Sequence, residues 1–308
     1  MTDPVTEKPT RCGFVALIGV PNAGKSTLLN ALVGAKISIV SRKVQTTRTQ
    51  IRGIAMAGRT QVIFVDTPGI FAPKRRLEKA MVTSAWGGAS DADRVGVLID
   101  VTHADHDDEE ALLAQLGEIR QPKFLILNKI DLVPHEKLLA ITATLNERIA
   151  FEATFMISAL RGHGVSKILE WLEERLPPGP WLYPEDEISD APLRFLAAEI
   201  TREKIFERLH DELPYRSTVE TEKWTVMKNG DVRIDQTIFV ERESQRKIVL
   251  GEKGQTIKRI GMAARKEIEE AAEAKVHLFL FVKVREDWAN DPERYREMGL
   301  EFPREPKR

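Results

Sequence analysis

The sequence predicts an α/β domain, with a mostly parallel sheet and helices on both faces, followed by a smaller α+β domain. In the first half, apolar strand-like runs alternate with helix-like patterns, which is typical of parallel sheets covered on both faces. A proline-rich segment then interrupts the chain. Beyond it, two alternating segments flank Asn229-Gly230, a strong signal for a hairpin turn.

The elements of the first half follow one another at wide intervals. The expected strands are residues 14–18, 62–65, 94–99 and 124–127, with a short fifth at 155–157. The expected helices are residues 26–33, 109–116, 135–149 and 165–176.

The second half begins after a linker. Proline lacks the N–H that helices and central strands need, so the segment 177–192 is expected to be neither. A helix at 192–212 follows, then the two alternating segments 218–227 and 232–241 and the short run 247–250, which prolongs the β-rich stretch. A helix at 255–272 and a strand at 276–284 complete the set. The predicted organisation is a disordered start (1–12), a first domain (13–176), a linker (177–191), a second domain (192–300) and a basic tail (301–308).

Composition excludes several classes of protein. The chain has 308 residues and a formal net charge of -1, so a nucleic-acid function requires a local basic patch. One cysteine, Cys12, excludes an internal disulfide framework and a cysteine-based zinc site. The start does not resemble a signal peptide, and no apolar run reaches the roughly 18 residues of a membrane span. We therefore expect a cytoplasmic protein.

Residues 19–26 read GVPNAGKS and fit the pattern G-x-x-x-x-G-K-[ST] between a strand and a helix. In this phosphate-binding loop, or P-loop, backbone N–H groups surround phosphate oxygens, and the helix N-terminus favours negative charge. Lys25 is expected to neutralise the β- and γ-phosphates, and Ser26 to bind Mg²⁺. The expected phosphate-binding residues are Gly19, Asn22, Ala23, Gly24, Lys25, Ser26 and Thr27, with Gly69 from the next motif.

Three further motifs follow strands: DTPG at 66–69, NKID at 128–131 and SAL at 158–160. Open α/β sheets bind ligands at the carboxyl ends of their strands, where all three lie. Asp66 can hold Mg²⁺ directly or through water. Asp131 can accept both N1–H and N2–H₂ of guanine, a donor pair that adenine lacks, so the base is expected to be guanine. The expected guanine-binding residues are Asn128, Lys129, Asp131, Ser158, Ala159 and Leu160.

This set resembles the nucleotide motifs of translation-factor-related GTPases, and residues 41–48 resemble their first switch. The resemblance makes Thr47 the Mg²⁺-sensing threonine, with Thr46 as the alternative. The expected Mg²⁺ ligands are then Ser26, Thr47 and Asp66. Ras-like GTPases orient the attacking water with a glutamine where this chain has Ile70, so slow intrinsic hydrolysis is expected.

Asn22 has two interpretations. In the resembling subgroup, an asparagine at this position helps to hold K⁺ beside the phosphates, which could replace an arginine finger. Alternatively, Asn22 is a loop residue that tolerates an unusual backbone angle.

The second domain contains a G-x-x-G pattern at Gly251 and Gly254. Seven basic residues and one acid between positions 246 and 266 give this region a local charge of +6. A G-x-x-G turn before a helix is how KH domains clamp about four nucleotides of single-stranded RNA. The alternative is a simple turn beside a solvated basic helix. The expected RNA-binding residues are Arg246, Lys247, Gly251, Glu252, Lys253, Gly254, Ile257, Lys258 and Arg259.

Taken together, the motifs GVPNAGKS, QTTR, DTPG, NKID, SAL and VLGEKGQTIKRIG, between residue 13 and about residue 300, resemble the Era family. The resemblance implies a P-loop GTPase domain followed by a type II KH domain, in a bacterial ribosome-assembly GTPase that uses GTP, GDP and Mg²⁺. It further implies binding to the 3′ end of 16S rRNA and the maturing 30S subunit, with GTP state coupled to RNA binding. A monomer with peripheral association with the inner membrane is also implied.

Two other functions compete with this interpretation. One is a membrane-associated signalling GTPase whose C-terminal domain binds protein. The other is the partner GTPase of an RNA-modifying enzyme. A partner GTPase of this kind is expected to carry cysteine-containing carbon-transfer machinery or a helical domain split around the GTPase domain. This sequence shows neither.

Overall fold

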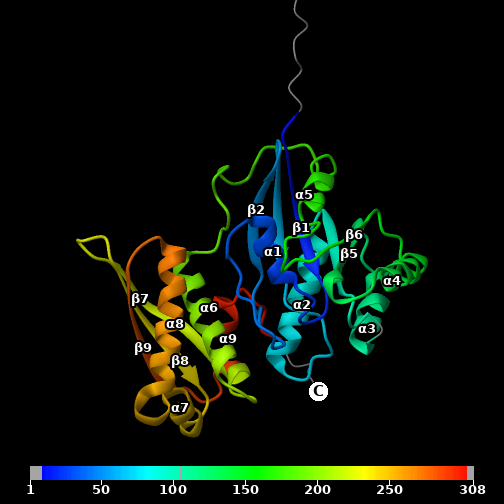
Figure 1. Ribbon diagram of the computed structural model, residues 1–308. Coiled ribbons are helices and arrows are strands. Elements are labelled where there is room, and N and C mark those ends of the chain that lie inside the picture. Colours follow the sequence, from blue (N-terminus) through cyan, green and yellow to red (C-terminus); the bar gives the residue numbers. More distant parts are fainter. Residues whose placement is uncertain (1–8, 105, 304–308) are drawn as a thin grey trace, which may run out of the picture. The chain divides into compact units, whose positions relative to one another are not determined.

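The computed structural model describes residues 9–104 and 106–303 and divides into two compact units (Figure 1). The first unit comprises residues up to 37, 49–73 and 81–190, and the second comprises 38–48, 74–80 and the chain from 191 onward. Two short segments of the first half therefore group with the second unit, which the uninterrupted boundaries drawn from the sequence do not anticipate. Most of the start that we expect to be disordered (1–8) and of the basic tail (304–308) lies outside the described residues.

A six-stranded sheet forms the core of the first unit, in the order β2-β3-β1-β4-β5-β6. Every neighbouring pair is parallel except β2 and β3, which are antiparallel, so the predicted mostly parallel sheet is confirmed. The strands are β1 (Arg11–Ile18), β2 (Ile51–Ala57), β3 (Thr60–Asp66), β4 (Arg94–Asp100), β5 (Lys123–Asn128) and β6 (Thr154–Met156).

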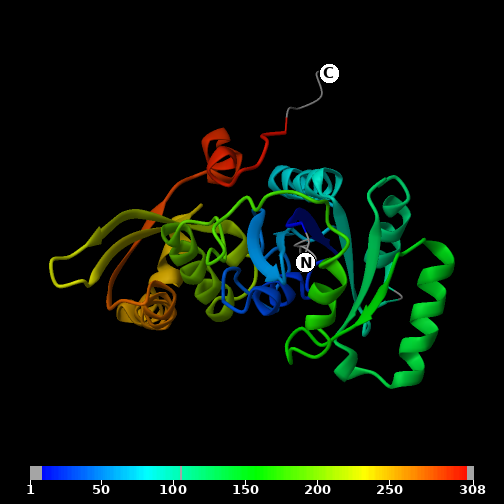
Figure 2. The ribbon, with the colours of Figure 1, turned by 90° about the horizontal axis from the view of Figure 1, so that it is seen from above.

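Helices cover both faces of this sheet. Figure 2 shows α1 and α5 on one side of it and α2 on the other. Two of the elements, β2 and α2, have no counterpart among the sequence-based expectations. The helices are α1 (Lys25–Val33), α2 (Arg76–Asp91), α3 (Asp107–Leu116), α4 (His135–Arg148) and α5 (Ser166–Leu172).

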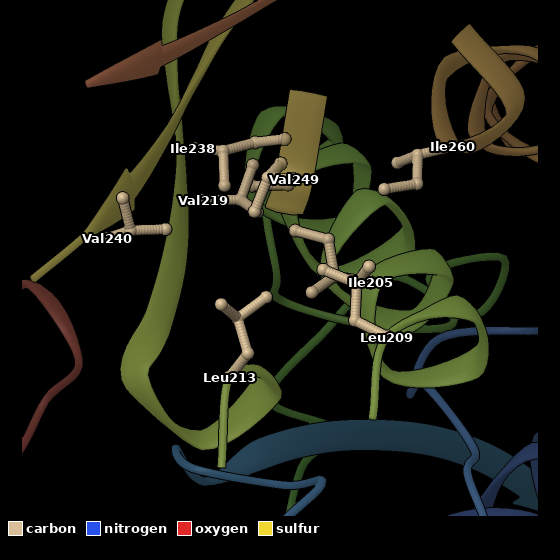
Figure 3. Close-up of a cluster of buried hydrophobic side chains, with 9 residues drawn as sticks. Ile205, Leu209, Leu213, Val219, Ile238, Val240, Val249 and Ile260 are labelled. Carbon is tan, nitrogen blue, oxygen red and sulfur yellow. The ribbon is translucent and has the colours of Figure 1, made fainter. Parts of the chain in front are cut away.

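The second unit is built on a three-stranded sheet in the order β7-β8-β9, with β8 antiparallel to β7 and parallel to β9. Helices α6 and α8 pack side by side against one face of this sheet. Buried side chains from α6, the sheet and α8, including Ile205, Ile238 and Ile260, form a core between these layers (Figure 3). The elements are α6 (Leu193–Arg208), β7 (Ser217–Val226), β8 (Val232–Val240), α7 (Glu243–Leu250), α8 (Gln255–Ala272), β9 (Val276–Val284) and α9 (Pro292–Glu297).

One sequence-based expectation about this unit is wrong. The run 247–250, expected to prolong the β-rich stretch, is the end of helix α7. The helix begins where the Gln245 side-chain oxygen accepts the backbone N–H groups of Glu241 (2.9 Å) and Arg242 (3.1 Å), which satisfies donors that a helix start leaves open. Among the residues that the structure describes, no helix is long and apolar enough to cross a bilayer.

Candidate nucleotide and RNA sites

The loop between β1 and α1 is shaped by glycines in close contact with its surroundings. Gly24 has a left-handed backbone (φ 103°), and a Cβ there would lie 2.3 Å from Nδ2 of Asn128. A Cβ on Gly19 would lie 2.5 Å from the carbonyl oxygen of Leu98. Neither position has room for a side chain, so the backbone of the loop is held close to its neighbours.

Lys25 opens α1 and lies almost completely buried. Its ammonium group donates to the carbonyl oxygens of Gly19 and Val20, both at 3.0 Å, so it is held against the loop. Burial lowers its pKa to about 8. Glu109, in the first turn of α3, is 1% exposed, and burial raises the pKa of its carboxyl group to about 8, with Lys25 opposing that shift. The lysine predicted to bind phosphate therefore shares a buried environment with an acid that the sequence patterns did not single out.

Ser26 and Asp66 lie together at the end of β3. The Ser26 hydroxyl donates to the Asp66 carboxylate at 2.6 Å. Hydroxyl and carboxylate oxygens are suitable ligands for Mg²⁺, so this pair fits the ion that the sequence predicts. Nearby, the N–H of Ile70 donates to the Gly19 carbonyl oxygen at 3.1 Å, and the Ile70 side chain is buried. Ile70 offers no polar group with which to orient a water molecule.

Asn128 joins the base-reading motifs to the phosphate loop. Its Nδ2 donates to the Ala23 carbonyl oxygen (2.8 Å), and its Oδ1 accepts the N–H of Ala159 (3.0 Å). The Ser158 hydroxyl and the guanidinium of Arg161, 3.1 Å away, hold the pKa of the Asp131 carboxyl group below its ordinary value. Asp131 is therefore a carboxylate at neutral pH, as guanine recognition requires.

Two residues near the predicted base site, Asp100 and Arg161, were not predicted from the sequence. The Lys129 ammonium forms an ion pair with Asp100 at the end of β4, and Arg161 follows the SAL motif. The position of Asp100 at the carboxyl end of a parallel strand was a usable signal for it. Leu160 is 85% exposed, so the backbone of the motif rather than this side chain is available to a base.

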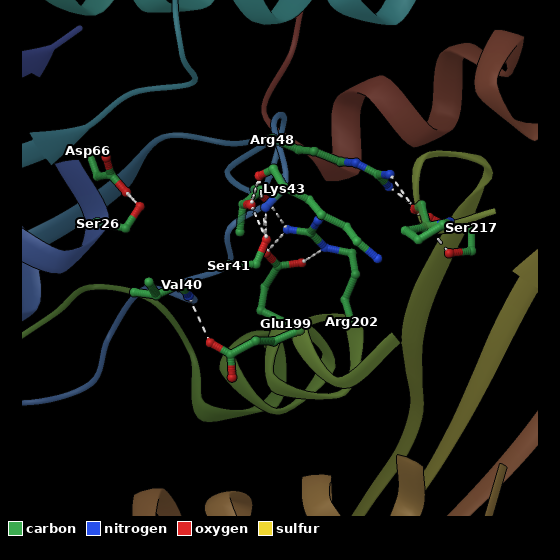
Figure 4. Close-up of polar contacts among 12 residues, drawn as sticks. Ser26, Val40, Ser41, Lys43, Arg48, Asp66, Glu199, Arg202 and Ser217 are labelled. Atoms are coloured by element: carbon green, nitrogen blue, oxygen red, sulfur yellow. Dashed lines mark hydrogen bonds and ion pairs between the residues drawn. The ribbon is translucent and has the colours of Figure 1, made fainter. Parts of the chain in front are cut away.

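The proposed switch segment groups with the second unit (Figure 4). Arg48 is buried there and donates to the backbone carbonyl oxygens of Ser217 (2.9 Å), Tyr215 (3.2 Å) and Pro214 (3.3 Å). The carbonyl oxygen of Thr46 accepts a hydrogen bond from Arg202 of α6. Thr47, a predicted Mg²⁺ ligand, belongs to this segment.

Asn22 has a left-handed backbone (φ 64°). Asparagine is one of the few residues that tolerate this conformation, so the backbone alone accounts for the residue type.

The G-x-x-G turn lies between α7 and α8. Gly251 (φ 71°) has no room for a side chain, because a Cβ would lie 2.1 Å from the Thr256 hydroxyl. Gly254 (φ 76°) caps α8 and has open space around it. Ile257 is partly buried, and Arg246 donates to the Val282 carbonyl oxygen of β9 at 3.3 Å. The other charged side chains of the predicted set are exposed to solvent: Lys247, Glu252, Lys253, Lys258 and Arg259.

Comparisons with known proteins agree with this arrangement. A family model described as a 50S ribosome-binding GTPase matches residues 14–129, and a KH domain model matches residues 212–289. GTPase Era of Afipia carboxidovorans is 65% identical over 96% of both chains. GTPase Era of Mesorhizobium japonicum is 64% identical over 98% of both.

Solved structures are similar over nearly the same length. A crystal structure of Era with MgGDPNP and nucleotides 1506–1542 of 16S ribosomal RNA is 36% identical, with a TM-score of 0.89, and covers 94% of this chain and 99% of its own. A point variant of Aquifex aeolicus Era bound to GDP and AlF4⁻ is 37% identical, with a TM-score of 0.88 and the same coverage. With its P-loop domain and its KH domain, this chain belongs to the Era family of GTPases.

Proposed function

We propose that this GTPase is an assembly factor that binds the 3′ end of 16S rRNA within the maturing 30S subunit, with its GTP state coupled to RNA binding. The observation that carries the proposal is a P-loop site and a basic G-x-x-G turn in one chain. The similar Era structure, solved with a 16S rRNA fragment, supports the choice of RNA.

The nucleotide chemistry follows from the first unit. Asp131 would read the guanine, Asn128 would fix the loops around it, and Lys25 would exchange its loop carbonyls for the β- and γ-phosphates. Ser26 and Asp66 would hold Mg²⁺, with Thr47 added when the switch closes, and the ion would neutralise charge that develops on the phosphates. Because Ile70 is apolar and buried, these residues bind and orient GTP without a side chain that activates water, and slow intrinsic hydrolysis follows.

A potassium ion beside Asn22 is part of the proposal. A cation there would stabilise charge on the leaving phosphate, as an arginine finger does. K⁺ should then raise the hydrolysis rate relative to Na⁺, and Asn22→Ala should remove the difference. Equal rates in the two salts would leave Asn22 as a loop residue.

RNA binding is assigned to the turn between α7 and α8. The left-handed Gly254 precedes the 18-residue helix α8, whose N-terminus lies beside the exposed Lys253 and Lys258. Helix N-termini and lysines both attract phosphates, and a glycine allows the RNA backbone close to the protein backbone. The turn can therefore clamp a short run of single-stranded RNA.

Coupling between the two activities is assigned to Arg48. Its guanidinium ties the segment 38–48 to the backbone before β7, so a movement of Thr47 toward Mg²⁺ would pull on the unit that holds the G-x-x-G turn. Arg48→Ala should preserve binding of RNA and of GTP separately while abolishing the effect of GTP on RNA affinity. A variant that keeps the wild-type difference between its GTP- and GDP-bound RNA affinities would refute this assignment.

The central experiment substitutes Gly254 with aspartate. The open space around Gly254 admits the side chain, whose charge repels phosphate, so Gly254→Asp should nearly abolish binding to a short RNA that matches the 16S 3′ end. GTP affinity and the circular dichroism spectrum should stay as in the wild type. A folded variant with undiminished RNA affinity would rule out the ribosome-assembly role and favour the signalling alternative, in which the second unit binds protein.

Location and assembly state complete the proposal. We place the protein in the cytoplasm, as a monomer with peripheral association with the inner membrane. Cell fractionation followed by sedimentation of the purified protein would test these points. A protein found entirely in the membrane fraction, or a stable dimer, would contradict them.

A further inference from the structure

The sheet of the second unit has a second face, opposite α6 and α8. The C-terminal part of the chain covers one end of this face, and Figure 2 shows α9 on the side away from α8. There, Phe239 is 9% exposed beneath the guanidinium groups of Arg294 (5.5 Å) and Arg285 (5.9 Å). The other end stays open, and on β9 Phe279 and Phe281 are 44% and 49% exposed. We call these two residues the β9 aromatic pair.

The β9 aromatic pair has regular geometry. Residues two apart on a strand point to the same face, about 6.6 Å apart. Their neighbours on β8 are Asp235 and Thr237, which are too small to cover them. The guanidinium of Arg233 lies 4.6 Å from the centre of the Phe279 ring, so this surface already holds one flat group against an aromatic ring.

A contact within the second unit connects the β9 aromatic pair to helix α7, which ends at the G-x-x-G turn. Strand β9 is at the edge of the sheet, and its alternate residues, Leu280 and Val282, pack inward. Arg246 of α7 hydrogen-bonds to the carbonyl oxygen of Val282, next to Phe281. A nucleotide chain that leaves the turn can therefore reach Phe281 by passing around the edge of a single strand.

Most charged groups on this face are paired. Arg233 pairs with Asp235 and Lys283 with Glu222, and the His277 ring hydrogen-bonds to Asp231. Lys223, opposite Asp235 on β7, adds one exposed positive charge. Such a surface offers phosphates little net attraction, but two half-exposed rings suit the uncharged faces of bases. Sheets of RNA-binding domains stack two or three bases on aromatic side chains in this way.

We propose that the β9 aromatic pair is a base-stacking surface for single-stranded RNA and that it extends the G-x-x-G site. The inference rests on the proposed RNA-binding function and adds a second contact to it. The turn holds phosphates through charge, and the pair holds the following bases by stacking. The second contact therefore adds affinity that depends little on salt, in contrast to the first.

The test compares two unstructured RNAs on the full-length protein, one of four nucleotides, to fill the turn, and one of ten. The double variant Phe279→Ala/Phe281→Ala should bind the short RNA as the wild type does. It should bind the long RNA at least about 30-fold more weakly, since two stacked bases contribute roughly 1–3 kcal/mol each. The ratio of the two affinities in the wild type should change little with salt. Thermal melting and GTP titration check that the fold is intact.

Phe281→Trp is the matched control, because it keeps a larger ring at the same position. It should bind the long RNA at least as tightly as the wild type, and its added fluorescence should be quenched by the long RNA and not by the short one.

The outcomes are separable. A double variant that binds the long RNA normally would overturn the inference, whether the pair then docks a protein or a second copy of this chain. A double variant that loses both RNAs would also overturn it, because the pair would then act only through the turn. A wild-type protein that binds neither RNA would refute the proposed function itself.

Discussion

Each unit contains a glycine turn that starts a helix, and the two turns differ in what surrounds them. In the first unit, Gly24 precedes α1 with Asn128 in contact, and Lys25 beside it is buried. In the second unit, Gly254 precedes α8 with no atom within 4 Å of an added Cβ, and Lys253 beside it is exposed. Both turns lie at the N-terminus of a helix, but of the two only the first is enclosed by other elements.

This difference separates two kinds of recognition. An enclosed loop can fix a small molecule from several sides and read its base through buried groups such as Asn128. An open turn can only clamp a backbone that continues past it in both directions, as a polymer does. A glycine turn before a helix is therefore suited to a nucleotide in one unit and to a nucleic acid strand in the other.

Matched alanine variants give the largest contrast between the two turns. Gly24→Ala adds strain in a left-handed backbone and pushes Asn128 away from its partners, so GTP affinity should fall at least about 1000-fold. Gly254→Ala meets no neighbouring atom, so the fold should persist and RNA affinity should fall no more than about tenfold. Nucleotide and RNA titrations measure both effects. A Gly24→Ala protein that binds GTP normally would show that the loop is not enclosed.

Base selectivity should be the next largest effect, and it belongs to the enclosed site alone. Asp131→Asn replaces the acceptor of the guanine N1–H and N2–H₂ with an amide, so GTP affinity should fall about 100-fold. Xanthine nucleotide, whose O2 can accept from that amide, should become the preferred ligand. Competition titrations with GTP and XTP measure the switch. Unchanged preference would remove Asp131 from the base site.

Glu109, the buried acid beside Lys25, predicts how the free energy of unfolding changes with pH. The pKa of Glu109 is raised from 4.5 to about 8, so between these pH values the folded protein keeps a proton that the unfolded chain has lost. Its contribution to the free energy of unfolding therefore falls as pH rises, and is fully lost above pH 8. Glu109→Gln, which mimics the protonated acid, should match the wild type near pH 4.5 and be more stable, by on the order of a few kcal/mol, above pH 8.

Urea denaturation of the nucleotide-free protein at the two pH values measures this difference. Glu110→Gln, at the exposed neighbouring position paired with Arg148, is the control and should not show that pH dependence. A Glu109→Gln variant that is less stable at high pH would mean that the carboxylate stabilises Lys25 more than its burial costs.

The smallest effect concerns the open turn. Each phosphate contact on single-stranded RNA contributes about 0.7 to the slope of log affinity against log salt. Lys258→Ala should therefore weaken RNA binding modestly and lower the slope by about 0.7 to 1, for all RNA sequences alike. Lys167→Ala, an exposed lysine of α5, should change neither quantity. An unchanged slope in Lys258→Ala would place RNA elsewhere than α8.

Elements with strong local signals could be predicted from the sequence. Strand β9 was expected with the bounds that the structure shows, because its centre, residues 278–282, is entirely apolar and follows a long amphipathic helix. Strand β2 was missed, because Gly53, Ala55 and Ala57 weaken its pattern. Its two-residue turn, Gly58-Arg59, was an available hairpin signal.

Helix α2 was missed for a different reason. It contains Gly87 and Gly88, which disfavour a helix locally. In the structure, a Cβ on Gly88 would lie 2.8 Å from Nε2 of Gln50, so a side chain there would disturb the hydrogen bond from Gln50 to the Ser84 carbonyl oxygen. Such tertiary requirements are not visible in local patterns.

The residues of the candidate site also divide into those with a local sequence signal and those that depend on tertiary packing. Motif residues such as Lys25 and Asp131 could be named as candidates because backbone geometry and base chemistry require them at fixed spacing. Glu109 could not be found in this way, because its role depends on burial and on neighbours that only the folded chain brings together.

The two hydrogen bonds of Asn128 also have a kinetic consequence. One bond ends on the loop predicted to surround the phosphates and the other on the backbone predicted to read the base, so one side chain joins the two parts of the site. A bound nucleotide should therefore leave in a single step, without a long-lived intermediate in which only its base or only its phosphates remain attached. The residence time of the nucleotide then depends on how long the buried Asn128 side chain keeps both hydrogen bonds.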